Sequence, residues 1–159
     1  MAVKKEKDKF SNNINIRNKK ASFEYSFIET YVAGIVLSGT EIKSIRMGLV
    51  NLQEAYCFFN RDELFVKSLH ISKYNQGTHY NHEPMRERKL LMKRKELNKL
   101  LGKSEENGVT IIPIRIFTND RGFAKLEIAL AKGKKLFDKR EDIKSKDVKR
   151  ELEKIVRLK

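Results

Sequence analysis

The feature that most constrains the fold is a pair of long apolar segments separated by four turn-forming residues. Residues 109–118 read VTIIPIRIFT and residues 123–131 read FAKLEIALA, with Asn-Asp-Arg-Gly between them. In the second segment the even-numbered residues from 124 to 130 are all apolar, whereas Phe123, Lys125 and Glu127 share the other face. The pattern predicts a β-hairpin with one buried face, and therefore a fold based on an antiparallel sheet.

Four further segments complete a predicted set of about six strands. Aromatic and polar residues alternate at 23–27, and the run YVAGIVL at 31–37 is apolar on both faces. Residues 55–59 and 64–71 flank Asn-Arg-Asp at 60–62, which predicts a second hairpin. We expect a mainly β fold: an OB-like antiparallel β-barrel with two or three helices and a basic C-terminal tail. An α+β sandwich stays open as an alternative, because periodicity does not define strand order.

Two helices are predicted between the strands. The run TEIKSIRMG has apolar residues at helical spacing, with Thr40 as a candidate N-cap and Gly48 as a candidate stop. Residues 86–101 carry a leucine stripe that ends before Gly102. Both segments have the amphipathic pattern of helices that pack against a sheet.

Positive charge is concentrated at the two ends of the chain. The protein has 35 Lys and Arg against 21 Asp and Glu, a formal net charge of +14. Residues 1–20 have a net charge of +5 and residues 132–159 of +6. We therefore expect a flexible basic arm at 1–15, a barrel at 16–131 and a basic tail at 132–159. Such charge favours a polyanionic partner, most often nucleic acid, with solubility alone as the alternative.

No pattern in the sequence is typical of an enzyme or a metal site. Cys57 lies in an apolar run without a histidine placed to activate it, and His79 and His82 lack clustered cysteines or carboxylates. The GKK run at 133–135 lacks the other residues of a P-loop. We expect no catalysis, no metal and no cofactor. No apolar stretch approaches the ~18–20 residues of a membrane span, and the start of the chain lacks the apolar region of a signal peptide, so we expect a soluble, cytoplasmic protein.

Basic and aromatic residues favour an RNA-binding surface. The runs RERK at 86–89 and KRK at 93–95 would put six basic residues on one helix, although a solvated helix face is the simpler interpretation. On the second strand of the predicted hairpin, Lys125 and Phe123 point away from the apolar face. A barrel with such a face can bind RNA through phosphate contacts and base stacking.

The C-terminal tail carries a helical pattern that cannot be stable by itself. Val148, Leu152, Ile155 and Val156 form one stripe, and Ser145 is a candidate N-cap. An isolated helix of about 14 residues is marginal in water, so the stripe implies a partner. Because the opposite face is strongly basic, we expect a segment that is disordered when free and helical when bound to RNA. A helix docked permanently on the barrel is the alternative.

Four runs, in order, carry a resemblance to a known family. They are NKKASFEY at 18–25, AGIVLSGTEIKSIRMG at 33–48, NHEPMRERKLL at 81–91 and AKGKKLFDKRED at 131–142. From about Asn18 to the end, the chain closely resembles the SsrA-binding protein (small protein B, SmpB) family. The resemblance implies an OB-like barrel, not an enzyme, that binds the tRNA-like domain of transfer-messenger RNA and acts in trans-translation, the rescue of stalled ribosomes. It also implies indirect work with alanyl-tRNA synthetase and elongation factor Tu, and a tail that becomes helical in the empty mRNA path of the small ribosomal subunit.

The resemblance also implies which residues contact RNA. Those expected to contact transfer-messenger RNA are Asn18, Lys19, Lys20, Gly34, Tyr56, Arg88, Leu91, Lys93 and Lys125. Leu91 could instead belong to the core, because it lies on the leucine stripe. Those expected to act on the ribosome are Gly133, Lys134, Lys135, Phe137, Asp138, Lys139, Arg140, Arg150 and Ile155.

The chain departs from the family pattern at five positions, and one of them, Lys93 where Asn or His is common, would add a phosphate contact. Val32 stands where the family usually has Glu, and Phe23 and Phe137 stand where His is frequent. Val148 replaces a frequent Trp in the tail, which would reduce the apolar area that the helix buries. The alternative function is that of a generic OB-fold translation factor or ribosomal protein that binds structured RNA, which would have no need of KGKKLFDKR followed by an amphipathic tail.

Overall fold

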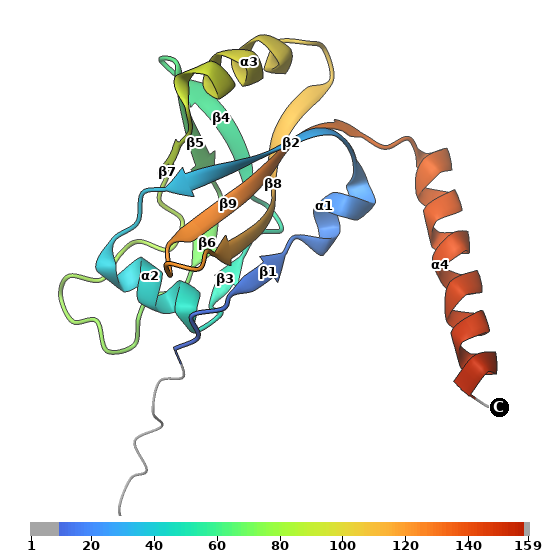
Figure 1. The fold of residues 1–159 in the computed structure, drawn as a ribbon, viewed down its shortest axis with the longest axis horizontal. Coiled ribbons are helices and arrows are strands. Elements are labelled where there is room, and N and C mark those ends of the chain that lie inside the picture. The colour runs from blue at the N-terminus through green and yellow to red at the C-terminus, as the bar shows by residue number, and fades with distance from the viewer. Residues whose placement is uncertain (1–9, 158–159) are drawn as a thin grey trace, which may run out of the picture.

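The computed structural model describes residues 10–157 of the chain and shows a β-barrel with three short helices around it and one long helix beside it (Figure 1). In chain order the elements are β1 (Asn15–Arg17), α1 (Lys19–Glu24), β2 (Tyr25–Ile35), α2 (Gly39–Arg46), β3 (Val50–Asn51), β4 (Tyr56–Asn60), β5 (Glu63–Lys67), β6 (His70–Ile71), β7 (Arg88–Leu91), α3 (Arg94–Ser104), β8 (Val109–Thr118), β9 (Ala124–Gly133) and α4 (Leu136–Arg157).

Six antiparallel strands close into a ring. The order is β8-β4-β5-β7-β2-β9, and β9 pairs again with β8. Strand β1 extends the ring at the edge of β8 beside β4, and β3 pairs with β6 in a separate two-stranded sheet. The closed ring confirms the predicted mainly β barrel of about six strands and excludes the sandwich.

The hairpin β8–β9 provides one wall of the core, as its alternation predicted. Leu126, Ile128 and Leu130 of β9 are at most 1% exposed and lie in the main apolar cluster. Fully burying a side chain of this size stabilises the fold by roughly 1.5–3 kcal/mol. Two predicted turns are also confirmed: Gly122 has a positive φ of 80°, and Arg61 and Asp62 have φ angles of 47° and 62°.

The predicted separate strands at 23–27 and 31–37 are wrong, because the segment forms α1 followed by the single strand β2. Asn18 explains the helix. Its side-chain oxygen accepts a hydrogen bond from the Ala21 backbone N–H at 3.1 Å, which caps the first turn. Strand β2 then runs without a break, with an irregular register between Phe27 and Glu29. The strand predicted from the alternation in the sequence is therefore confirmed only from Tyr25 onward.

The predicted helix at 86–101 is wrong in its first half. Residues 88–91 form β7, which pairs with β5 on one side and with β2 on the other. Helix α3 begins only at Arg94, and Glu96 accepts a hydrogen bond from the Lys93 backbone N–H at 3.3 Å. Ring closure needs a strand between β5 and β2, and this requirement overrides the helical spacing. The six basic residues therefore do not share one helix.

Helix α2 and the N-terminal segment also differ in detail from expectation. The N-cap of α2 is Ser38 rather than Thr40, and Gly48, with a φ of 76°, confirms the predicted stop. Of the predicted arm, residues 1–9 lie outside the described residues. The part that is described is attached: Ile14 lies in the core, and its backbone N–H donates to Thr118 Oγ1 at 3.0 Å.

The tail forms the 22-residue helix α4, which extends away from the barrel (Figure 1). It begins at Leu136, so the prediction of Ser145 as its N-cap is wrong. None of its residues is buried. Its start is tied to α1, because Lys134 Nζ donates to the Ser22 carbonyl at 3.1 Å and Lys146 lies over the Phe23 ring. The structure therefore does not show the alternative, a helix docked along the barrel; disorder in the free protein stays a prediction.

A buried carboxylate joins α2 to β7. Glu41 and Arg88 are both fully buried, and Arg88 Nε donates to Glu41 Oε1 at 2.7 Å. The other Glu41 oxygen accepts from Arg86 Nη2 at 2.6 Å. Burial alone would raise the pKa of Glu41, but hydrogen bonds from Arg86, the Ser38 backbone and Arg88 outweigh it, so the pKa lies below its ordinary value.

Removing this carboxylate should destabilise the barrel strongly. Glu41→Gln leaves the guanidinium of Arg88 buried without its counter-charge, and breaking such a pair costs about 3–5 kcal/mol. Urea unfolding at neutral pH measures the change. Glu54→Gln is the matched control, because Glu54 pairs with Lys20 at an exposed site, where a pair contributes at most about 1 kcal/mol. Equal effects of the two substitutions would contradict the assigned role of Glu41.

The same pair should make stability depend on pH in the acid range. Because the folded pKa of Glu41 lies below the unfolded one, its contribution is complete above the ordinary Glu pKa and is lost as the pH falls through the folded pKa. The difference in unfolding free energy between the unsubstituted protein and Glu41→Gln should therefore shrink on acidification. A difference that stays constant down to the acid transition would show that Glu41 is not responsible.

Candidate nucleic-acid interface

One candidate surface lies on the outside of the barrel across β7, β2 and β9. Gly34 of β2 pairs with Leu91 of β7 and with Lys125 of β9, so the three residues form a row on one side of the sheet. Leu91 is 52% exposed, which places it outside the core. We call Leu91, Gly34 and Lys125, with the flanking Val32, the β2–β9 face.

Gly34 brings the other two side chains of the row close together. A Cβ placed on Gly34 would lie 3.3 Å from Leu91 Cβ and 3.8 Å from Lys125 Nζ. The lysine amine therefore extends over the bare backbone of the glycine, toward the leucine. The row presents a cation beside an exposed apolar side chain, a combination that suits a phosphate beside a ribose or base.

No acidic residue in the described part of the chain neutralises the charge of Lys125. Glu127, two residues away on the same face, is ion-paired with Arg115, and the guanidinium of Arg115 lies 4.5 Å from the centre of the Phe117 ring. Lys125 itself makes no ion pair with any residue that the structure describes. The exposed Val32, which pairs with Glu127, adds no charge. The β2–β9 face is thus open to an anion at Lys125.

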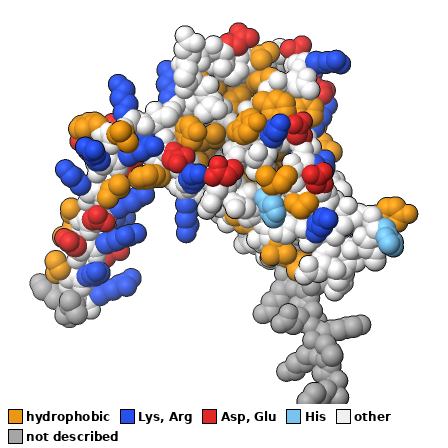
Figure 2. Space-filling model, turned by 180° about the vertical axis from the view of Figure 1, so that it is seen from behind, with side chains coloured by type: hydrophobic (Ala, Val, Ile, Leu, Met, Phe, Trp, Pro, Cys, Tyr) orange, Lys and Arg blue, Asp and Glu red, His pale blue; other side chains and the backbone are white. Residues whose placement is uncertain are grey.

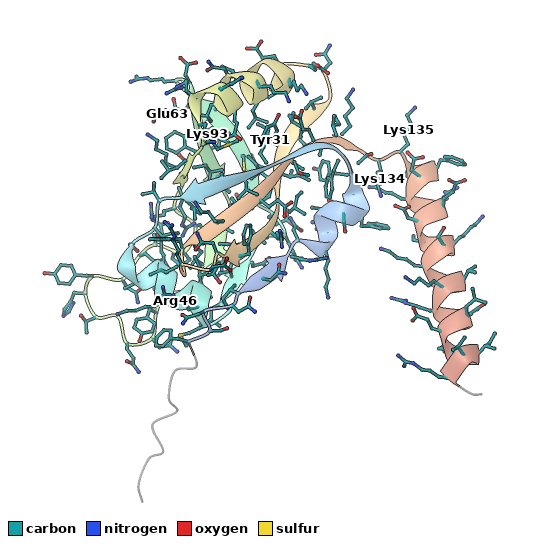
Figure 3. The ribbon with its side chains drawn as sticks, viewed as in Figure 1. Tyr31, Arg46, Glu63, Lys93, Lys134 and Lys135 are labelled. Atoms are coloured by element: carbon teal, nitrogen blue, oxygen red, sulfur yellow. The ribbon has the colours of Figure 1, made fainter. Side chains whose placement is uncertain are left out.

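Lys93 continues this surface beyond the end of β7. It lies two residues after Leu91 in extended backbone and is exposed (Figure 3). By contrast Lys89, on the same strand, is held by Glu63 at 2.6 Å. Lys93 therefore offers the freer positive charge of the two.

A second group of predicted residues lies elsewhere, on α1 and β4. Lys19 and Tyr56 are exposed, and Lys20 Nζ lies 2.5 Å from Glu54 Oε1, whose hydrogen bond raises the pKa of the amine. A cavity of about 490 Å³ between them is lined by Asn18, Lys20, Ala21, Glu24, Tyr25, Gln53, Glu54, Ala55, Tyr56, Ser68, Thr110 and Ile112. In the six-stranded ring β4 stands opposite β2. Tyr56 therefore lies across the barrel from Gly34, whereas Lys19 and Lys20 lie on α1, which packs against β8 and β2.

Two of the predicted RNA contacts are interior residues, so a direct contact through their side chains is wrong. Arg88 is fully buried and donates to Glu41 and to the carbonyl oxygens of Leu69 and Pro84. Asn18 is 4% exposed, and its amide donates to two backbone carbonyls besides capping α1. Asn18 instead caps α1, and Arg88 instead holds β7 to α2. Their polar side chains gave no sequence signal that distinguishes this role from contact with a ligand.

The predicted ribosomal residues lie along the exposed tail. Gly133 ends β9, and Lys134 and Lys135 lead into α4 (Figure 3). Phe137, Asp138, Lys139 and Arg140 occupy the first helical turns, with Arg150 and Ile155 farther along. The exposed apolar side chains of α4 are Leu136, Phe137, Ile143, Val148, Leu152, Ile155 and Val156. Figure 2 shows apolar and basic side chains alternating along this helix, with no partner from the barrel beside most of them.

Sequence reasoning missed several residues that shape these surfaces. One is Glu41, whose place three residues after Ser38 is the sequence signature of a capping box. Arg46 and Arg121 line a groove between α2 and the β8–β9 turn. Over residues 10–157, no cluster of His, Cys, Asp and Glu could hold a metal ion. In the same range, no helix is long and apolar enough to span a membrane.

The close packing of Gly34 against Leu91 predicts that a methyl group added at Gly34 will disturb Leu91. In Gly34→Ala the new Cβ meets Leu91 at a distance that requires a shift of a few tenths of an ångström. We expect the methyl resonances of Leu91 to move in a carbon-detected NMR spectrum while the melting temperature changes little. Gly39→Ala is the control, because a Cβ there has no neighbour within 4 Å. Unmoved Leu91 resonances in Gly34→Ala would contradict the described packing.

Comparison with known proteins gives one consistent family. The model of the SmpB protein family matches residues 15–158. The chain is 61% identical over 143 residues to the SsrA-binding protein of Cytophaga hutchinsonii, covering 90% of this chain and 94% of that protein. It is 55% identical over 141 residues to that of Bacillus licheniformis, covering 89% of each.

A solved structure agrees with the sequence comparisons. A chain from "tmRNA-SmpB: a journey to the center of the bacterial ribosome" superposes with a TM-score of 0.66 at 42% identity, covering 79% of this chain and 87% of that one. The resemblance first seen in four short runs therefore extends over nearly the whole sequence and over the barrel. On these grounds the chain belongs to the SmpB protein family.

Proposed function

We propose that this protein binds the tRNA-like domain of transfer-messenger RNA with its barrel and serves the rescue of stalled ribosomes by trans-translation. Its relatives are named SsrA-binding proteins, and the similar solved structure concerns tmRNA and SmpB in the bacterial ribosome. The observation that carries the proposal is the uncompensated Lys125 beside the exposed Leu91 on the β2–β9 face. This arrangement offers RNA a phosphate contact and an apolar contact in one place.

The two sides of the barrel would serve two partners at once. The β2–β9 face takes the RNA domain. We assign the surface of α1 and β4, with Lys19 and Tyr56, to a ribosomal contact, in place of the contact with transfer-messenger RNA expected for these two residues from the resemblance. A delivery factor needs this division, because the RNA that it carries must not cover the surface that docks. Alanyl-tRNA synthetase and elongation factor Tu would act on the RNA in the same complex.

The tail would act only on the ribosome. An exposed helix with one apolar stripe and a basic remainder has no internal reason to be stable, because none of its residues is buried. An RNA-walled channel such as the empty mRNA path neutralises the basic face and covers the stripe. We assign Lys134, Lys135 and the Asp138-Lys139-Arg140 run to the entry of this channel.

The protein would be a binding factor and not an enzyme, working in the cytoplasm where ribosomes are found. The described surfaces supply cations and apolar contacts, which bind RNA without transforming it. Incubation of the protein with the RNA domain and divalent metals should leave the RNA intact. Metal-dependent cleavage would overturn the binding-only role.

Lys125→Ala should weaken binding of the tRNA-like domain. Loss of one phosphate contact reduces the slope of log affinity against log salt by about 1 and lowers affinity at physiological salt. Filter binding over a series of salt concentrations measures both quantities. Lys73→Ala removes an equal charge from the exposed loop between β6 and β7, and serves as the control. If the two variants lose affinity equally, general charge and not the β2–β9 face holds the RNA.

Deletion of residues 133–159 should separate RNA binding from rescue. The shortened chain keeps the barrel and should bind the tRNA-like domain as tightly as the full chain, with bulk tRNA as competitor. It should fail to tag chains on ribosomes stalled without a stop codon. Tagging by the shortened protein would contradict the role of the tail. Equal competition by bulk tRNA would favour the alternative of a generic OB-fold factor for structured RNA.

A further inference from the structure

A groove opens at the end of the barrel between α2 and the β8–β9 turn. It has a volume of about 390 Å³, within the usual range of small-ligand sites. Its lining consists of Ile35, Leu37, Ser38, Gly39, Ile42, Arg46, Arg121, Gly122, Phe123 and Ala124. The walls are largely apolar, two arginines supply the charge, and the lining contains no acidic residue. Such a groove favours a flat apolar group that is attached to an anion.

Arg46 is one of the two arginines that line this groove. It is the last residue of α2, and its Nη2 donates to the Gly122 carbonyl at 3.3 Å (Figure 3). Its Nε is buried and has no hydrogen-bond partner among the residues described. A buried donor without a partner is costly, because it has lost water and gained nothing in return. The remaining nitrogen, Nη1, has no described partner and is not enclosed, so a ligand with an acceptor in the groove would bond to Nη1.

Phe123 stands at the rim of the groove with its ring largely free. It is 64% exposed, although its backbone is held on both sides of the turn: Asn119 Oδ1 accepts from its N–H at 2.8 Å, and its carbonyl accepts from the Asn119 N–H at 2.9 Å. A fixed backbone presents the ring in a defined place without the entropy cost of ordering a loop. Exposed aromatic rings of this kind are the usual stacking platforms for unpaired bases.

The groove adjoins the β2–β9 face. Phe123 lies two residues before Lys125, on the same side of the chain in the β8–β9 hairpin. Ile35, in the wall, directly follows Gly34. RNA held at Lys125 therefore passes close to the groove, and the continuity selects RNA over other anionic ligands as the occupant.

We propose that this groove receives one unstacked base of the bound RNA, with Phe123 stacking on the base and Arg46 hydrogen-bonding to its polar edge. Arg121, exposed at the rim, would contact the adjoining phosphate. The site rests on the proposed function, because the RNA is brought there by the β2–β9 face. It adds a contact to an unpaired nucleotide, so that the barrel would read the shape of a loop and not only the charge of a helix.

The first test uses Phe123→Trp as a reporter. The protein contains no tryptophan, so the introduced indole is the only one. Stacking on a base should quench its fluorescence as the tRNA-like domain is added, while affinity stays within about twofold of the unsubstituted protein. Tyr80→Trp is the control, because Tyr80 is 92% exposed and lies outside the groove. Its fluorescence should change little at the same RNA occupancy.

The second test compares affinities. Phe123→Leu keeps an apolar side chain but removes the ring, and loss of one base stack should lower RNA affinity about tenfold. Arg46→Lys keeps the charge but removes the forked guanidinium donors, and should lower affinity several-fold. Arg61→Lys, an exposed arginine in the β4–β5 turn, is its control. Melting temperatures confirm that each variant is folded.

The outcomes separate this inference from the proposed function. Quenching in Phe123→Trp together with loss of affinity in Phe123→Leu and Arg46→Lys supports the groove. If the unsubstituted protein binds the RNA tightly, but neither quenching nor loss of affinity is seen, the groove is not a base site while the proposed function stands. If the unsubstituted protein does not bind the RNA, the proposed function fails and the inference fails with it.

Discussion

The buried contact between Glu41 and Arg88 is the constraint on which the rest of the structure depends. Arg88 belongs to β7, the strand that connects β5 to β2 and so closes the ring. Its guanidinium also donates to the carbonyl oxygens of Leu69, just before β6, and of Pro84, near the end of the long loop before β7. One buried cation thus anchors α2, the loop and the closing strand together, and neither partner of the pair can be removed without leaving a charge in the core.

Ring closure in turn decides which residues meet on the surface. Leu91, Gly34 and Lys125 come from three separate stretches of sequence and become neighbours only because β7, β2 and β9 are adjacent in the barrel. The same order of strands places Tyr56, on β4, across the barrel from Gly34. The proposed division of labour, RNA on one side and the ribosome on the other, is therefore a consequence of strand order. The groove at Phe123 extends the first side toward the barrel end.

The tail differs from the barrel in how it treats its apolar residues. The barrel buries its apolar residues against each other, whereas α4 leaves its stripe exposed from Leu136 to Val156. Its connection to the body is short and polar, through Lys134 and the contact of Lys146 with Phe23. A segment attached in this way can change its conformation on binding a partner without disturbing the barrel. This independence fits a factor whose RNA binding and ribosomal action are separate steps.

The sequence by itself determined the features that arise from local pattern. The β8–β9 hairpin, the turn at Arg61 and Asp62, the stop of α2 at Gly48 and the helical stripe of the tail all follow from periodicity and turn chemistry over a few residues. The sequence also identified the family, because four motifs that occur in the same order are specific to it.

Only the tertiary structure decided the rest. Residues 88–91 have helical spacing but form a strand, because the ring needs one there, and the burial of Arg88 follows from that placement. Leu91 could be core or surface until β2 was placed beside it, with Gly34 opposite. Such choices depend on contacts between residues far apart in the chain. Their free energies appear only when the barrel closes, and no local pattern contains them.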